Sequence, residues 1–356
     1  MSDPHDQATD APRGIDPGGV AAWFEAHVPG VATPLRFDLV AGGRSNLTYV
    51  VTDAAGRRYV LRRPPTGHVL PTAHDMAREH KIISALGPAG VPVPPALGLC
   101  LDESVTGAPF YVMGFVDGVI ARNEQDVEAY LDVGARRRAG LALVDTLAQI
   151  HGVDPDAAGL GDLGRKDGYI ARQLKRWYAN YKAANEARGG TSLQAMDDLH
   201  ERLSRAIPEQ GSATVVHGDY RLDNCILAPD GSCVLAVLDW ELCTLGDPLA
   251  DLGQLMVYWP EPGEKSALGH APTTMPGFPS RQELTARYAE TTGRDLDGLG
   301  FYVAFAYWKL AAILEGVYSR YVAGVMGDDK FDFSGYVDTI SWLSSLADEA
   351  ARKIGV

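Results

Sequence analysis

The sequence predicts an α+β fold in which a small antiparallel β-sheet precedes a larger, mainly helical part. The first third of the chain alternates with the period of two typical of strands, whereas the remainder carries apolar residues at helical spacing. At 356 residues the chain is long enough for two lobes. We expect a flexible tail over residues 1–15, a first lobe over 16–118 and a second lobe over 119–356.

The first lobe should begin with a helix and continue as a sheet. Asp16-Pro17 is typical of an N-cap followed by the first helical position, and a short helix through Trp23 and Phe24 should follow. Strands are predicted over 35–40, 47–52, 57–62, 96–101 and 109–116, with a helix over 73–86. The last strand ends at Asp117-Gly118, where we expect the connection to the second lobe.

The second lobe is predicted to be helical with one small β insert. Predicted helices cover 131–151, 169–186, 193–207, 248–258, 281–291, 300–322 and 333–351. Short strands over 214–217, 225–227 and 234–238 interrupt this pattern. Residues 261–279 are rich in Gly, Pro and Thr and predict a long loop whose role the sequence leaves open.

Charge and composition argue against several classes of function and of structural site. The 32 Lys and Arg against 46 Asp and Glu give a net charge of −14, which argues against a nucleic-acid partner. The four cysteines form no CxxC pair, so neither a disulfide framework nor a zinc site is indicated. The N-terminus lacks an apolar signal core, and no apolar run approaches the roughly 20 residues that span a bilayer. We expect a cytoplasmic protein with no membrane partner, of undetermined oligomeric state.

Two acids and an amide around the β insert predict phosphoryl transfer. Asp219 and Asn224 lie five residues apart, so one loop can present both, and the following hairpin returns Asp239 to the same end. Phosphoryl transfer requires metal ions to neutralise the phosphate charge and a carboxylate to orient the attacking hydroxyl. A single Asp in a loop would more simply cap a turn. The three residues together favour a kinase.

These residues belong to a motif that resembles the aminoglycoside/choline phosphotransferase-like kinases. The family patterns HGDxxxxN and D-[FW]-[DEG] are matched at 217–224 and 239–241. Residues 41–46, 59–65 and 246–251 look most like the branch related to the kinase domain of acyl-CoA-dehydrogenase-fused phosphotransferases. The resemblance implies a protein-kinase-like bilobal fold that uses ATP and Mg²⁺.

The same resemblance implies a role for each residue of the motif. Asp219 would be the catalytic base or the group that orients the attacking hydroxyl, and Asn224 and Asp239 would bind Mg²⁺. We expect His217 to brace the loop through hydrogen bonds rather than transfer protons. Asp251 would accept hydrogen bonds from the same loop from the first turn of a helix that Asp247 caps.

Two further residues keep more than one interpretation. Glu241 could reach a metal or face solvent, and the sequence favours neither. Trp177, with the basic residues beside it, could face a phosphorylated or CoA-like ligand, although a packing helix is the more common use of such a pattern.

In the first lobe the resemblance implies phosphate-binding residues. Gly43, Ser45 and Asn46 lie in a loop that would cover the phosphates, although a plain hairpin turn would use the glycines equally well. Arg62 replaces the usual phosphate-binding lysine, and Glu79 on the following helix is its expected partner.

The adenine ring would bind beside these residues. Val60 shares a strand face with the phosphate-binding arginine and would lie under adenine. Met113 would line the pocket, and the backbones of Gly114 and Val116 would pair with the base. A methionine in an apolar strand is more often a core residue, so this prediction depends on the chain leaving the strand into helices.

The resulting prediction is a small-molecule kinase that phosphorylates a hydroxyl group with ATP and Mg²⁺. The branch resemblance points to a hydroxyacyl-CoA as the small-molecule substrate. One alternative is an aminoglycoside-type antibiotic phosphotransferase, which would need an acidic pocket in the 261–279 loop or the C-terminal helices. Another is a noncatalytic nucleotide-binding pseudokinase, which the arginine at position 62 suggests and the intact acids oppose. The sequence does not choose between ATP and GTP.

Overall fold

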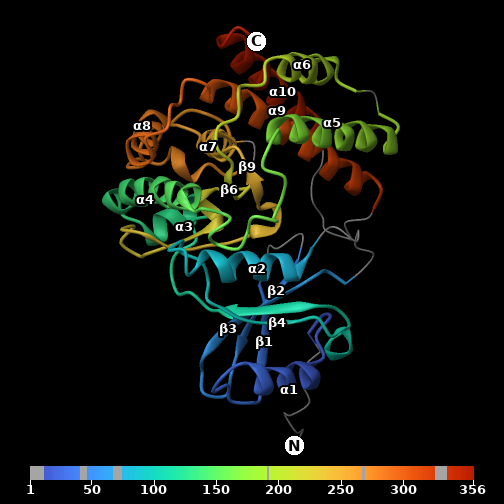
Figure 1. Ribbon diagram of the computed structural model, residues 1–356, viewed down its shortest axis with the longest axis vertical. Helices are drawn as coiled ribbons and strands as arrows, with labels where there is room; N and C mark the ends of the chain where they lie inside the picture. Colours follow the sequence, from blue (N-terminus) through green and yellow to red (C-terminus); the bar gives the residue numbers. More distant parts are fainter. Residues whose placement is uncertain (1–11, 41–45, 67–73, 191, 267–268, 325–334) are drawn as a thin grey trace, which may run out of the picture. The chain divides into compact units, whose positions relative to one another are not determined.

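The computed structural model describes residues 12–40, 46–66, 74–190, 192–266, 269–324 and 335–356. The chain forms two compact units, Met1–Asp117 and Gly118–Val356. In Figure 1 the first unit runs from blue to cyan and holds the sheet, and the second runs from green to red and is mainly helical. The predicted order, an antiparallel sheet followed by helices, is confirmed.

The sheet of the first unit has five antiparallel strands in the order β1-β2-β3-β5-β4. Their bounds are Arg36–Leu39 for β1, Leu47–Thr52 for β2, Arg58–Arg63 for β3, Ala96–Cys100 for β4 and Phe110–Gly114 for β5. Trp23 and Phe24 of α1 (Pro17–His27) share a core with Tyr49 of β2 and Leu61 of β3. Because side chains alternate along a strand, this packing leaves Arg62 on the opposite face.

The start of the first unit is held by hydrogen bonds. The carboxylate of Asp16 accepts the amide of Gly18 at 3.0 Å, as expected of an N-cap. The predicted tail, residues 1–15, lies mostly outside the described residues, but its end is fixed. The Tyr49 hydroxyl donates to the carbonyl of Arg13 at 2.6 Å, and Ile15 is buried.

Eight helices are described in the second unit. They are α3 (Glu124–Tyr130), α4 (Val133–Gly152), α5 (Tyr169–Ala187), α6 (Gln194–Arg205), α7 (Pro248–Val257), α8 (Arg281–Thr292), α9 (Leu299–Val322) and α10 (Tyr336–Lys353). The core of this unit gathers around α9, against which α5, α7 and α10 pack. The short α3, capped by Asn123, was not foreseen as a separate helix.

The β insert consists of two antiparallel pairs. β7 (Cys225–Leu227) and β8 (Val234–Val237) form the predicted hairpin, whereas β6 (Thr214–Val216) pairs with β9 (Thr244–Gly246). The three residues of β9 are too few to show a period, so the sequence did not reveal this strand. The pairing places Gly246, just before α7, beside Thr214 at the start of β6. Helix α7 then packs against β6, so that Asp251 reaches the residues that follow this strand.

Helix α9 is long and apolar enough, by length and composition, to cross a membrane, although the sequence predicted no such segment. A core helix of a soluble protein passes the same test, and 61% of its most apolar window is buried inside the structure. Trp308, Lys309 and Glu315 are among its buried residues. The helix therefore has a clear role as the core of the second unit, and its hydropathy is weak evidence for anything else.

We predict that Gly253→Ala destabilises the protein. A Cβ at Gly253 of α7 would lie 2.7–2.8 Å from the backbone of Tyr302 on α9, so the two helices would have to move apart. The resulting overpacking should cost about 1–3 kcal/mol and outweigh the better helix propensity of alanine. The thermal midpoint of unfolding measures the effect. Gly152→Ala at the end of α4, where a Cβ meets nothing within 4 Å, is the control and should leave the midpoint unchanged or higher.

Candidate functional site

The loop after β6 is anchored by a buried carboxylate. The side chain of Asp251, on the first turn of α7, accepts the backbone amides of His217 at 2.6 Å and Gly218 at 2.9 Å. It also contacts Nε2 of His151 at 3.3 Å. Burial alone would raise the pKa of Asp251, but the hydrogen bonds from His151 and the Gly218 amide lower it overall. The carboxylate is therefore ionised and fixes the loop backbone.

His217 braces the loop from inside, as expected from the sequence. Its Nδ1 accepts the backbone amide of Asp219 at 3.2 Å, and its Nε2 donates to the carbonyl of Leu238 at 2.9 Å. Both ring nitrogens are thus engaged with the backbone, and the ring packs on Trp240 with 4.6 Å between centroids. These bonds connect the loop to the segment that carries Asp239.

The carboxylate of Asp219 is held at both oxygens. Oδ1 accepts from Nε2 of Gln254 at 3.1 Å, and Oδ2 accepts from Nδ2 of Asn224 at 3.2 Å. The same Asn224 nitrogen donates to the Asp219 carbonyl at 2.9 Å. The guanidinium of Arg221 lies 3.3 Å from Oδ2 as an ion pair, without the alignment of a hydrogen bond. Asp219 is half-buried, so solvent or a substrate can still reach it.

The structure brings the three motif residues together. The β7–β8 register pairs Cys225 with Val237, and the amide of Leu238 donates to the carbonyl of Asn224 at 2.8 Å. Asp239 therefore follows directly beside Asn224, which itself contacts Asp219. Asp239 has the left-handed φ of 63°, which is costly for a residue other than glycine and recurs at functional sites.

Arg221 adds positive charge to this group of acids. Its Nη1 lies 3.0 Å from Asp223, and its guanidinium lies over the ring of Tyr258 at 5.5 Å. Burial opposes the charge of Arg221, but the carboxylates of Asp219 and Asp223 raise its pKa overall. Burial raises the pKa of Asp223.

Two further residues contact the loop, and sequence reasoning missed both. Lys309 of α9 donates to the carbonyl of Gly218 at 3.1 Å and to Oε1 of Gln254 at 2.7 Å. Gln254 of α7 in turn donates to Asp219. The available signal was a lysine in the apolar run of α9, but nothing in the sequence pairs it with a residue 55 positions earlier.

The first unit contains the predicted ion pair. Nε of Arg62 lies 3.1 Å from Oε2 of Glu79, whose side chain is 2% exposed. The Tyr111 hydroxyl donates to the same oxygen at 3.1 Å. When the amide of Asn46 is turned so that its oxygen faces Arg62, it accepts from Nη2 at 3.0 Å and donates to Nδ1 of His74 at 2.8 Å. Three predicted residues of this lobe thus lie together.

The structure describes only some of the other residues predicted to bind the nucleotide in the first lobe. Gly43 and Ser45 lie outside the described residues. Val60 pairs with Met113 across β3 and β5, so these two adenine-lining candidates are neighbours. The amide of Gly114 donates to the carbonyl of Pro95 at 2.8 Å, so this amide is already engaged within the lobe. A backbone donor to the base would then have to come from Val116.

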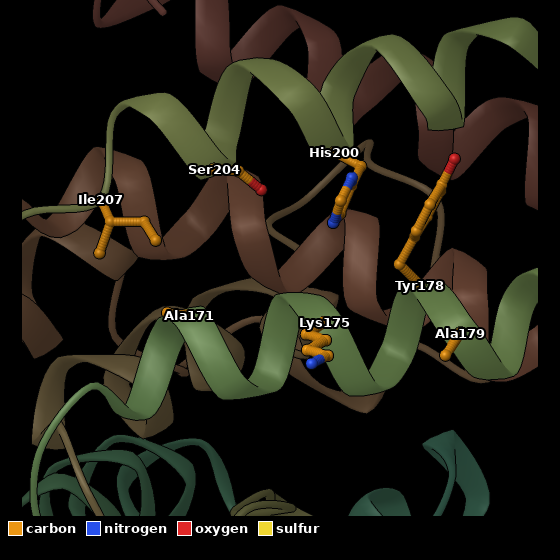
Figure 2. A pocket seen from close by; sticks show the side chains of 7 residues that line it. All are labelled: Ala171, Lys175, Tyr178, Ala179, His200, Ser204 and Ile207. Carbon is orange, nitrogen blue, oxygen red and sulfur yellow. The ribbon is translucent and has the colours of Figure 1, made fainter.

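A separate hollow of about 460 Å³ lies between α5 and α6 (Figure 2). Figure 2 shows Lys175 on α5 and His200 and Ser204 on α6 around it, and Tyr178 lies beside the His200 ring. The two rings are stacked with 3.9 Å between centroids. This hollow lies outside the 261–279 loop and the C-terminal helices, where an aminoglycoside would need acidic side chains. A second hollow in that region is lined by Glu264 together with Lys265 and Arg281.

Comparison with known proteins places this chain among phosphotransferases. The sequence profile of the phosphotransferase enzyme family matches residues 37–284, more than half of the chain. Acyl-CoA dehydrogenase family member 10 of Mus musculus is 39% identical over 333 residues, which are 92% of this chain but 30% of that protein. The chain thus spans about a third of this curated relative.

Solved structures agree with the family match. A crystal structure from Ralstonia eutropha JMP134, provisionally named an aminoglycoside phosphotransferase, is 34% identical, with a TM-score of 0.77, and the match covers 95% of this chain and 99% of that one. Spectinomycin phosphotransferase in complex with ADP and spectinomycin shares 14% identity with a TM-score of 0.58, over 96% and 98% of the chains. The kinase-like fold predicted from the sequence is confirmed.

We predict that His151 makes stability fall as the pH is lowered. Burial lowers the pKa of His151, although Asp251 opposes the shift, so the folded state holds a neutral ring. Below the unfolded pKa of about 6.5 the unfolded chain binds a proton that the folded chain does not, and stability should fall by up to about 1.4 kcal/mol per pH unit. Urea titrations at pH 7 and about pH 5.5 measure the slope.

The slope should be shallower in His151→Gln, which keeps a donor for Asp251 but does not titrate. His270→Gln is the control, because the His270 side chain is 62% exposed. Equal pH slopes for wild type and His151→Gln would show that this histidine is not the source.

Proposed function

Because the chain belongs to the phosphotransferase enzyme family, we propose that it transfers the terminal phosphoryl group of ATP to a hydroxyl group of a small molecule. The observation that carries this proposal is the convergence of Asp219, Asn224 and Asp239 on one loop and the adjoining hairpin. A catalytic carboxylate and two oxygen ligands for a metal are what phosphoryl transfer needs.

In this reaction the hydroxyl oxygen forms a bond to the terminal phosphorus while the bond from that phosphorus to the bridging oxygen of ADP breaks. The hydroxyl proton passes to Asp219 and from there to water. The hydrogen bonds from Gln254 and Asn224 support this role, since they hold the carboxylate in one orientation as an acceptor. Asp251 supports it indirectly by fixing the loop backbone.

Mg²⁺ would be held by Asn224 through Oδ1 and by Asp239. Both offer hard oxygen ligands, and the Asn224 nitrogen already points to Asp219, which directs its oxygen to the other side. Within the described ranges no three His, Cys, Asp or Glu side chains gather into a metal cage. Mg²⁺ commonly binds through one or two protein ligands together with phosphates and waters. When bound, the metal neutralises charge on the phosphate oxygens.

The nucleotide phosphates would meet Arg62. Arginine keeps its charge and presents a planar fork of donors, so it can contact phosphate while it pairs with Glu79. The spectinomycin phosphotransferase structure, which has this fold and contains ADP, supports a nucleotide as the ligand. Adenine would lie against Val60 and Met113, which are paired across two strands.

For the acceptor we propose a hydroxyacyl-CoA. The proposal is supported by the relatives named acyl-CoA dehydrogenase family members, of which this chain matches about a third. It is also supported by charge, because α5 carries Lys175 and Arg176 exposed beside Trp177 in a chain of net charge −14. Trp177 lies 5.8 Å from the ammonium of Lys309, which contacts the catalytic loop. A polyanionic CoA would find a favourable surface there.

The alternative acceptor is an aminoglycoside, which the name of the Ralstonia eutropha structure favours. The experiment is incubation of the full chain with Mg-ATP and separate panels of hydroxyacyl-CoAs and aminoglycosides, with mass detection of the phosphorylated product. Transfer only to hydroxyacyl-CoAs supports our proposal, and transfer only to aminoglycosides replaces it. Binding of ATP without transfer in either panel would indicate a noncatalytic nucleotide-binding protein.

We predict that Asp219→Ala abolishes phosphoryl transfer and leaves nucleotide affinity largely intact. The carboxylate acts on the hydroxyl and not on ATP, so kcat should fall by at least about 100-fold. Product formation measured by mass spectrometry and nucleotide binding measured by calorimetry test both parts. Retained turnover would rule out the assigned role. Asp230→Ala, in the exposed turn between β7 and β8, is the control and should behave as wild type.

We predict that Arg62→Met weakens nucleotide binding by about 10-fold or more, because a charge-assisted contact to phosphate is lost. Calorimetry with ADP and ATP measures the dissociation constants. The variant also leaves Glu79 without its arginine, so its thermal midpoint must be measured alongside. Arg36→Met, at an exposed position on β1, is the control. Unchanged affinity in a folded Arg62→Met protein contradicts the assignment.

A further inference from the structure

We propose that Gln254 and Lys309 are positioning residues that set the orientation of the Asp219 carboxylate through a directed chain of hydrogen bonds. The chain runs from the Lys309 ammonium to Oε1 of Gln254 at 2.7 Å, and from Nε2 of Gln254 to Oδ1 of Asp219 at 3.1 Å. The inference rests on the proposed function, because orientation of this carboxylate matters only if it directs a hydroxyl group.

The direction of the chain follows from what each group can donate. An ammonium donates only, and an ionised carboxylate accepts only. Gln254 therefore has one satisfactory amide orientation, with its oxygen toward Lys309 and its nitrogen toward Asp219. The opposite orientation would place an amide oxygen against the carboxylate and an NH₂ group against the ammonium. The cation thus fixes the amide, and the amide fixes the catalytic oxygen.

The position of Lys309 is costly, which indicates a function for it. It is 5% exposed on α9 between Trp308 and Leu310, in the apolar core of the second unit. Burial lowers its pKa, while Asp219 and Asp251 act in the opposite direction. A well-packed apolar side chain would fill such a core position at lower cost.

The second bond of Lys309 also leads to the catalytic loop. The ammonium donates to the carbonyl of Gly218 at 3.1 Å, and the amide of the same residue is held by Asp251 at 2.9 Å. Both backbone polar groups of Gly218, its carbonyl and its amide, are therefore hydrogen-bonded to side chains. The bond from Gln254 restrains the side chain of the next residue, Asp219. Together these bonds connect α7 and α9 to one carboxylate oxygen.

The first test replaces the donor of Gln254 with an acceptor. Gln254→Glu keeps the shape of the side chain and can pair with Lys309, but it places a carboxylate oxygen against Asp219. We expect kcat to fall about 10- to 100-fold, with KM for ATP changed less than about twofold, because misorientation affects the reacting group and not nucleotide binding. Gln282→Glu, at an exposed position of α8, is the matched control and should retain wild-type kcat.

The second test separates the charge of Lys309 from its packing. Lys309→Met keeps an unbranched apolar stem without the ammonium, and it should lower kcat as Gln254→Glu does. Lys309→Arg restores a donor-only cation and should recover most of the lost kcat. Equal loss in both variants, or equal retention in both, would contradict a role that depends on the directed hydrogen bond.

A third measurement does not depend on activity. Crystal structures of wild type and Gln254→Glu should show the Asp219 carboxylate rotated away from its wild-type orientation in the variant, while the Asp251 bonds to the loop remain. An unchanged Asp219 orientation overturns the inference, whatever the kinetics. If the wild-type protein phosphorylates no acceptor, the proposed function fails, and this structural comparison still decides whether Gln254 positions Asp219.

Discussion

The conformation of the candidate catalytic loop depends on one buried carboxylate, that of Asp251. It accepts hydrogen bonds from two backbone amides that would otherwise need water. Asp251 is 1% exposed, yet it holds a negative charge because His217 and Gly218 donate to it and His151 completes its shell. Removing either side of such an arrangement leaves a buried polar group without a partner, which costs several kcal/mol. The Asp251 carboxylate therefore keeps the loop in one conformation against α4 and α7. The position of Asp219 follows from the conformation of this loop.

The two acids that contact this loop, Asp251 and Asp219, have hydrogen-bond partners of different kinds. Asp251 is paired with backbone donors and stays out of chemistry, whereas Asp219 is half-buried and is restrained at both oxygens by neutral amides of Gln254 and Asn224. Neutral amides orient a carboxylate through hydrogen bonds, while the ion pair to Asp219 comes from Arg221 at 3.3 Å. The cations Arg221 and Lys309 lie close by and limit the repulsion among the acids.

Local signals in the sequence predicted most of the fold and the motif residues. They failed where an element or a side chain is positioned by a contact with a residue far away in the sequence. The caps at Asp16 and Asp247 follow from short-range chemistry and were read correctly. Strand β9 is defined only by its pairing with β6, and the two strands are too far apart in the sequence for a short segment to contain both. The bond from Lys309 to Gln254 joins positions on two different helices, and no local pattern in either helix points to the other. The site roles themselves stay predictions that the proposed variants address.

The arginine at position 62 is the feature that most favours a noncatalytic protein, and the geometry weakens that argument. Arg62 engages Glu79 through Nε and Asn46 through Nη2, and its guanidinium carries further N–H groups on its other edge. A lysine would use its single nitrogen for both the ion pair and a phosphate, whereas the fork of arginine serves partners on two edges. Tyr111 also donates to Glu79, so the buried carboxylate does not rely on the arginine alone. The substitution is therefore compatible with nucleotide binding, and the intact acids of the second unit favour catalysis.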